Sequence, residues 1–253
     1  MTAIWWMLMC WGVEGAQVKA WQEEIEARLG GPVRVVEYPG GAVEGPGALY
    51  LSNPAFLQAL EGARALTLNL RSGGQQMPYI FVNRRNMPTE EAAANLIVAH
   101  ELGHIWLQAQ DYFPPRFGQG SNACVAIHVG DIVQHHLIRR EMDRRGIAWR
   151  EITAREYEAA WRQSQGGSQA AGDVCLRARR LSLMVDLRAG FAGEEAEWWR
   201  GYLKLLGEQD PEAEARAIEL AERWGGDWEL TQENYQRALA EVTDAMGAVL
   251  SLD

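Results

Sequence analysis

The chain contains little cysteine, which limits the metal sites and cross-links that the sequence predicts. Its 253 residues include only three cysteines, Cys10, Cys124 and Cys175. An odd number does not make a disulfide framework, and none of the three lies in a CxxC pair, the common spacing of cysteine ligands to a metal. We therefore expect reduced, buried thiols, although Cys124 and Cys175 are able to pair in an oxidising compartment.

The chain also lacks an excess of positive charge. Lysine and arginine number 24 against 34 aspartates and glutamates, so the formal net charge is -10. Nucleic acids and anionic membranes attract basic proteins, and we expect neither of them as a partner. Two arginine clusters, around Arg139 and around Arg179, lie in predicted helices with acidic neighbours, and we interpret each cluster as a solvated helix face.

The apolar run at residues 4–11 lacks the features of a membrane segment or of a signal peptide. It is too short to span a bilayer, and no lysine or arginine precedes it. We interpret the run as a buried strand in a strand, helix, strand unit and expect a cytoplasmic protein. A secretion leader is the alternative interpretation.

The hydrophobic pattern predicts the α+β class, with an N-terminal mixed β-sheet and helices followed by a mainly helical C-terminal half. After the first run, strands are expected at 33–38, 48–51, 65–70 and 79–83, and helices at 18–29 and 54–60. From residue 121 onward, helical spacing predicts helices at 121–145, 153–164, 170–190, 194–207, 211–224 and 231–250. We expect a mixed α/β subdomain at 1–110 and a helical subdomain at 111–253.

All 5 histidines lie between positions 100 and 136, and two of them belong to the pentapeptide HELGH at residues 100–104. Residues four positions apart share a helix face, so His100 and His104 can reach one metal ion while Glu101 lies beside it. The motif stands in an apolar run of helix length, where these polar side chains would be costly without a partner. Imidazole ligands suit zinc best, and we predict a Zn²⁺ ion bound by His100 and His104.

A catalytic zinc usually has three protein ligands, and we expect the third one on the next helix. His128, Asp131 and His135 fall on one stripe of that helix. Asp131 is the preferred ligand, with His135 as a catalytic residue that steadies a bound group or an oxyanion. His128 and His135 are the alternative ligands, and His136 and Tyr112 are further candidate oxyanion donors.

The HExxH motif with an acidic residue on the next helix resembles the zincin metallopeptidases of the gluzincin and aspzincin type. The resemblance implies a peptide or protein substrate that pairs with an edge strand, here similar to residues 79–83. The change in composition after residue 111 separately predicts a loop at 113–120, which we expect over the site. The resemblance also implies peptide-bond hydrolysis. In that reaction zinc lowers the pKa of a bound water towards about 7, and Glu101, the general base, takes the proton of that water.

A protein without catalytic activity is the alternative from a different functional class. Such a protein would bind peptides in a regulatory role on a zincin scaffold and would retain the metal. Glu101 argues against this alternative, because a structural zinc site needs no base beside the metal. The sequence does not indicate an oligomeric state.

Overall fold

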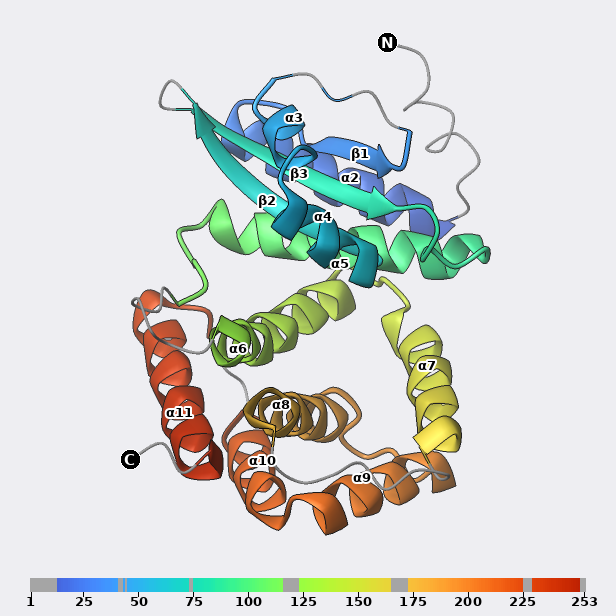
Figure 1. Cartoon of the computed structure of the whole chain (residues 1–253), viewed down its shortest axis with the longest axis vertical. Helices are drawn as coiled ribbons and strands as arrows, with labels where there is room; N and C mark the ends of the chain where they lie inside the picture. The colour runs from blue at the N-terminus through green and yellow to red at the C-terminus, as the bar shows by residue number, and fades with distance from the viewer. Residues whose placement is uncertain are drawn as a thin grey trace. The chain divides into compact units, whose positions relative to one another are not determined.

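The computed structural model describes residues 13–40, 43, 45–72, 75–115, 123–164, 173–224 and 229–250. The chain divides into two compact units. The first unit comprises Met1–Asp111 and Glu141–Trp149, and the second comprises Tyr112–Arg140 and Arg150–Asp253. The fold class is α+β as predicted, with a mixed sheet near the N-terminus and a mainly helical remainder (Figure 1).

The sheet of the first unit has three strands in the order β1-β3-β2. Strand β1 (Arg34–Tyr38) runs parallel to β3 (Gln75–Asn83), and β2 (Ala65–Ser72) runs antiparallel to β3. Among the described residues, β1 and β2 are thus the outer strands. The expectation that residues 79–83 form an edge strand is wrong. Tyr79, Ile80 and Phe81 are all 0% exposed, because a central strand is covered on both faces.

Helices cover both faces of this sheet (Figure 1). The two long helices α2 (Val13–Leu29) and α5 (Glu91–Gln108) pack against each other on one face. The short helix α4 (Pro54–Gly62) packs on the other face. It begins where the sequence predicts, since the Asn53 side chain accepts hydrogen bonds from two backbone N–H groups of its first turn.

The segment predicted as a strand at 48–51 forms one helical turn instead, α3 (Gly47–Tyr50). Pro46 precedes this turn with φ -60, a value that proline has in any structure and that suits the start of a helix. Gly47 packs so closely on Tyr79 that a Cβ atom there would lie 2.5 Å from a ring carbon. The proline and this close packing outweigh the short apolar pattern of the segment.

The second unit is built mainly from helices that surround α8. The helices are α6 (Ala123–Arg144), α7 (Trp149–Ser164), α8 (Val174–Gly190), α9 (Glu197–Gln209), α10 (Pro211–Trp224) and α11 (Gln232–Leu250). They confirm the helices predicted from residue 121 onward. Helix α8 packs against α9, α10 and α11, and its Leu181, Met184 and Leu187 are 0% exposed. An apolar surface of this kind makes α8 the centre of the unit.

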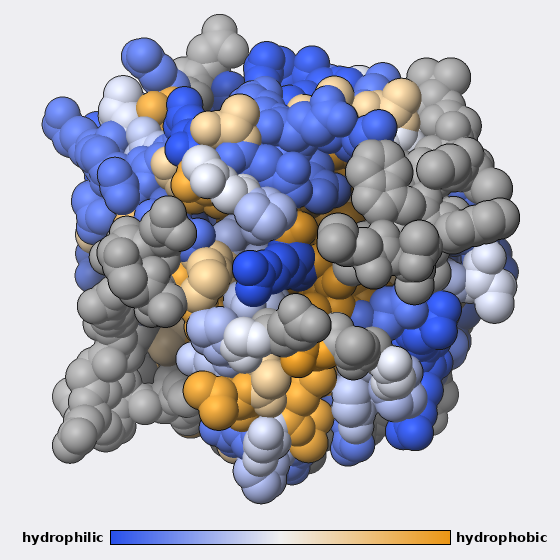
Figure 2. Space-filling view, turned by 90° about the horizontal axis from the view of Figure 1, so that it is seen from above, coloured by the Kyte–Doolittle hydropathy of each residue, from blue (hydrophilic) through white to orange (hydrophobic). Residues whose placement is uncertain are grey.

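Two sequence predictions lie outside the described residues, the strand at 4–11 and most of the loop at 113–120. Of the helices that are described, none combines the length and the apolar character needed to cross a membrane. Figure 2 shows hydrophilic side chains over much of the face in view, with smaller hydrophobic areas between them. Scattered apolar exposure of this kind is normal for a folded protein and marks no site by itself.

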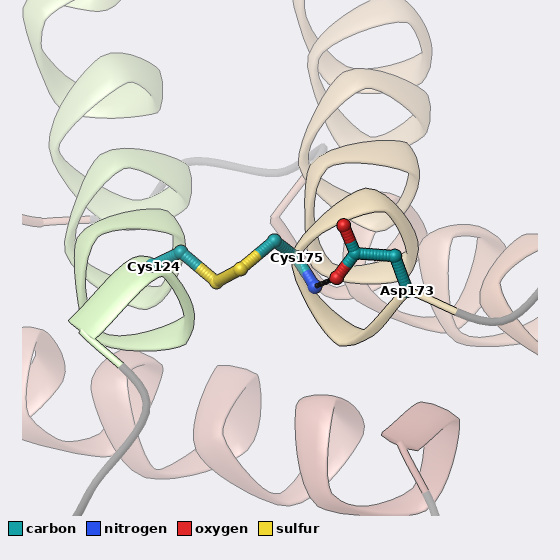
Figure 3. Close-up of a disulfide and its surroundings, with 3 residues drawn as sticks. All are labelled: Cys124, Asp173 and Cys175. Atoms are coloured by element: carbon teal, nitrogen blue, oxygen red, sulfur yellow. Dashed lines mark hydrogen bonds between the residues drawn. A yellow bond between two sulfur atoms is a disulfide. The ribbon is translucent and has the colours of Figure 1, made fainter.

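Cys124, in the first turn of α6, and Cys175, in the first turn of α8, form a disulfide bond (Figure 3). Their Cα atoms are 5.7 Å apart, a usual distance for such a bond. Asp173 caps α8 beside it, because its carboxylate accepts a hydrogen bond of 2.9 Å from the backbone N–H of Cys175. The bond corrects the expectation of reduced thiols: an odd cysteine count excludes a full framework but not a single pair.

Removing this cross-link should destabilise the second unit. The cysteines are 51 positions apart, so their bond restricts the unfolded chain, and the double variant Cys124→Ser/Cys175→Ser should lose about 2 to 4 kcal/mol of unfolding free energy. Urea unfolding followed by circular dichroism measures the loss, and wild-type protein treated with dithiothreitol is the control. Thiol titration of unfolded, unreduced protein should find one free thiol; three free thiols would contradict the assignment.

Candidate metal centre

Helix α5 carries the HELGH motif and holds it against the core of the first unit. Ala99, Leu102 and Ile105, which alternate with the polar residues of the motif, are 0% exposed. On the neighbouring helix α2, the ring of Trp21 meets the ring of Trp106 edge-on at 6.1 Å between centroids. This packing fixes the rotation of α5 and therefore the direction in which the polar side chains of the motif point.

The imidazoles of His100 and His104 face each other across one helical turn. Their Nε2 atoms are 3.2 Å apart, and the two ring planes meet at 81°. Two nitrogen ligands at about 2.05 Å from one tetrahedral zinc ion are about 3.3 Å apart, so the observed separation fits a shared ion. A hydrogen bond between two neutral rings has a similar length. The metal content of the protein distinguishes these two possibilities.

Glu101 is buried between α5 and the sheet, with 8% of its surface exposed. Its Oε2 atom accepts a hydrogen bond of 2.6 Å from the Thr67 hydroxyl, and its backbone carbonyl lies 3.3 Å from the same hydroxyl. Thr67 belongs to β2, the outer strand that packs on α5. A carboxylate at this depth needs such a donor, because burial without one costs several kcal/mol, roughly 2 to 7 for a polar group.

Asp131 and His135, the other predicted site residues, lie on α6 in the second unit. His135 Nε2 is 3.9 Å from Asp131 Oδ1, and His135 Nδ1 is 4.0 Å from Asp186 Oδ2 on α8. The His135 side chain is 20% exposed and that of Asp131 32%. Carboxylates therefore lie near both ring nitrogens of His135, at distances longer than those of hydrogen bonds.

Asp186 itself is held by two residues of the second unit. Arg139 approaches it at 2.7 Å and 3.0 Å, and the Tyr157 hydroxyl donates to Oδ2 at 3.1 Å. Burial and the Asp186 charge raise the pKa of Tyr157, so the phenol stays protonated and donates. Burial opposes the charge of Arg139, yet Asp186 raises its pKa overall. The carboxylate that faces His135 is therefore fixed by a charged and a neutral donor.

This cluster corrects the interpretation of the arginine clusters as solvated helix faces. The Arg139 side chain is only 13% exposed, and Arg180 is 3% exposed. Arg145 is also largely buried, at 12%, and its guanidinium lies over the Trp21 ring. Acidic neighbours on the same helix predict a solvated face only where no second helix covers that face. The sequence pattern of one helix does not show which other helices pack on it.

The remaining candidates from the sequence lie within the second unit. His128 is one turn before Asp131, and burial, with a smaller effect of Arg179, lowers its pKa. His136 lies 5.4 Å from the Trp224 ring, and burial, with nearby arginines, lowers its pKa to about 4. The Tyr112 hydroxyl donates to a backbone carbonyl at 3.2 Å. These contacts make His136 and Tyr112 poor oxyanion donors.

Two residues that orient the candidate site, Thr67 and Asp186, are not among the predicted site residues. Asp186 is a single charge in the segment LSLMVDL at 181–187, whose other residues are apolar or small. A charge isolated in this way indicates a buried carboxylate that needs a partner. Thr67 stands between Leu66 and Leu68 in a strand and gives a weaker signal. The partner of each lies on another element, so the pairings themselves require the fold.

No known protein family, no curated protein and no solved structure matches this chain.

The variant Asp186→Asn should destabilise the protein strongly. The substitution removes the charge that pairs with Arg139, whose side chain is 13% exposed, and breaking a buried pair from one side costs about 3 to 5 kcal/mol. Urea unfolding of the wild type and the variant measures the difference. Asp244→Asn is the matched control, because Asp244 is exposed on α11 and its replacement should change little. Equal stability of the two variants would show that the Asp186 cluster contributes nothing.

Proposed function

We propose that the protein is a zinc-dependent metallopeptidase of the zincin type, with His100 and His104 as metal ligands and Glu101 as the general base. One observation carries the proposal, the separation of 3.2 Å between the Nε2 atoms of the two histidines. The same helix presents a buried carboxylate one residue after the first ligand. Two imidazoles at the spacing of zinc ligands, with a base beside them, support hydrolysis by an activated water.

We propose His135 as the third ligand in place of Asp131. The imidazole of His135, like those of His100 and His104, offers a ring nitrogen of the kind that zinc accepts. Asp186 near the Nδ1 atom of His135 supports this role, as carboxylates near metal-binding histidines commonly do. Asp131 is the alternative third ligand, since zinc also accepts carboxylate oxygens and its Oδ1 lies 3.9 Å from His135 Nε2.

In the proposed reaction, the metal ion, Glu101 and Thr67 have separate roles. Zinc, when bound, supplies a Lewis acid and lowers the pKa of a water ligand towards about 7. Glu101 accepts the proton of the attacking water and delivers it to the nitrogen of the leaving amine, as a general base that becomes a general acid. Thr67 holds Oε2 at 2.6 Å, which leaves Oε1 as the oxygen that receives the proton.

Strand β2 is the proposed binding strand for the substrate. It is an outer strand among the described residues, and it carries Thr67 beside Glu101. An extended peptide can pair with the backbone of an outer strand, which brings a peptide bond to the residues next to that strand. The role that the family resemblance implied for residues 79–83 therefore passes to β2.

The disulfide supports a site of action in an oxidising compartment. Thiols of most cytoplasmic proteins are kept reduced, whereas bonds such as Cys124–Cys175 persist outside the reducing cytoplasm. We therefore propose an oxidising compartment in place of the cytoplasmic location expected from the sequence.

The metal proposal predicts about one zinc ion per chain, measured by elemental analysis of untagged protein. His104→Ala and His135→Ala should each lose the metal, because each removes a ligand. Asp131→Ala and His128→Ala should retain it and serve as controls on the same helix as His135. Zinc lost in Asp131→Ala but kept in His135→Ala would make Asp131 the third ligand. Wild-type protein without metal, even after zinc is supplied, would refute the proposed function.

The enzymatic proposal predicts that Glu101→Gln keeps its zinc and loses hydrolysis. A positioned general base contributes about 100-fold to 10,000-fold, so kcat on an unstructured protein or a peptide library should fall by at least about 100-fold. Mass spectrometry of the cleaved peptides measures both rate and specificity. Zinc-loaded wild type that binds peptides and cleaves none of them would favour the regulatory, non-catalytic alternative.

A further inference from the structure

We propose that Thr67 is a positioning residue for Glu101, which it holds in the orientation that the proton transfer requires. The inference rests on the proposed function of Glu101 as the base. It assigns a role to a residue of β2 outside the HELGH motif. The hydrogen bond from the Thr67 hydroxyl to Glu101 Oε2, 2.6 Å long, is the observation from which it starts.

The Thr67 hydroxyl donates its proton to one oxygen of the Glu101 carboxylate. A threonine hydroxyl has a single proton, so it donates to Oε2 at 2.6 Å rather than to the Glu101 carbonyl at 3.3 Å. Thr67 thus fixes the position of Oε2 and leaves Oε1 to accept the proton of the water.

The position of Thr67 is itself well determined. Thr67 pairs with Ile80 of the central strand β3, and Ile80 is 0% exposed, so the backbone of Thr67 is held by its pairing with the core of the first unit. A β-branched side chain has few accessible rotamers, which limits the directions the hydroxyl takes. A donor with few rotamers on a paired strand fixes one carboxylate oxygen and, through it, the direction of the other.

A purely structural role for Thr67 makes different predictions from a positioning role. If the hydroxyl only satisfies a buried carboxylate, its loss lowers stability and leaves the turnover of folded protein unchanged. If it orients the base, its loss lowers kcat as well, and that effect disappears once the carboxylate is removed. A double-mutant cycle between Thr67 and Glu101 separates the two roles.

The experiment compares Thr67→Val, which keeps the shape and removes the hydroxyl, with Thr67→Ser, which keeps the hydroxyl. We expect Thr67→Val to lower kcat by about 10-fold to 100-fold, the usual effect of removing an orienting partner, with KM and zinc content unchanged. Thr67→Ser should restore most of the rate. In the Glu101→Ala background, Thr67→Val should have no further effect on the residual rate. Thr243→Val, on α11, is the control for the same chemical change.

Urea unfolding of the metal-free proteins gives a second readout that does not depend on activity. Thr67→Val should lower the unfolding midpoint of the wild type more than that of Glu101→Ala, since the bond exists only when both residues are present. Equal shifts in the two backgrounds would overturn the inference, because they would show that the two side chains are not coupled.

The outcomes for activity separate this inference from the proposed function. A Thr67→Val enzyme with wild-type kcat, beside an inactive Glu101→Gln, would overturn the positioning role and leave the peptidase proposal intact. Zinc-loaded wild type that hydrolyses no peptide would overturn the proposed function, and the positioning role with it. A loss of kcat that Thr67→Ser restores would support both.

Discussion

The burial of polar side chains on α5 is the constraint on which the candidate site depends. A helix whose Leu102 and Ile105 are 0% exposed holds Glu101 at 8% exposure, where an unpaired carboxylate would destabilise the fold. The fold therefore has to supply a donor, and β2 supplies Thr67. The same pairing that makes the buried carboxylate tolerable also gives it a single orientation. The stability of the fold and the orientation of the Glu101 carboxylate thus depend on one hydrogen bond.

The second unit meets the same constraint with charges. Asp186 has a side chain that is 11% exposed, and its charge is balanced by Arg139 and by a hydrogen bond from Tyr157. Such a cluster is rigid, because a movement of one member breaks the hydrogen bonds of the others. His135 faces this carboxylate through Nδ1 and so adjoins a fixed charge. An imidazole beside a fixed carboxylate is better prepared to bind a metal than one that turns freely in water.

The sequence predicts those elements whose signals are local. The start of α4 at Asn53 and Pro54 is correct, because capping chemistry lies within a few residues, and the helices from residue 121 onward follow from their periodicity. The features that depend on distant partners are wrong or missing. Residues 79–83 are central rather than at an edge, Cys124 bonds to Cys175, and Thr67 reaches Glu101 from another element. The HExxH motif gave the candidate ligands but not the residues that orient them.

A shared metal ion and a direct hydrogen bond require different tautomers of His100 and His104. A hydrogen bond between the two Nε2 atoms requires one ring to carry its proton on Nε2 and the other on Nδ1, although both sit on the same helix face. A shared zinc ion requires the same state of both rings, with protons on Nδ1 and both Nε2 lone pairs directed at the ion. The separation of 3.2 Å is close to the ligand spacing of tetrahedral zinc. In the proposed function, one ion binds both Nε2 lone pairs beside a carboxylate that already accepts a hydrogen bond from the sheet.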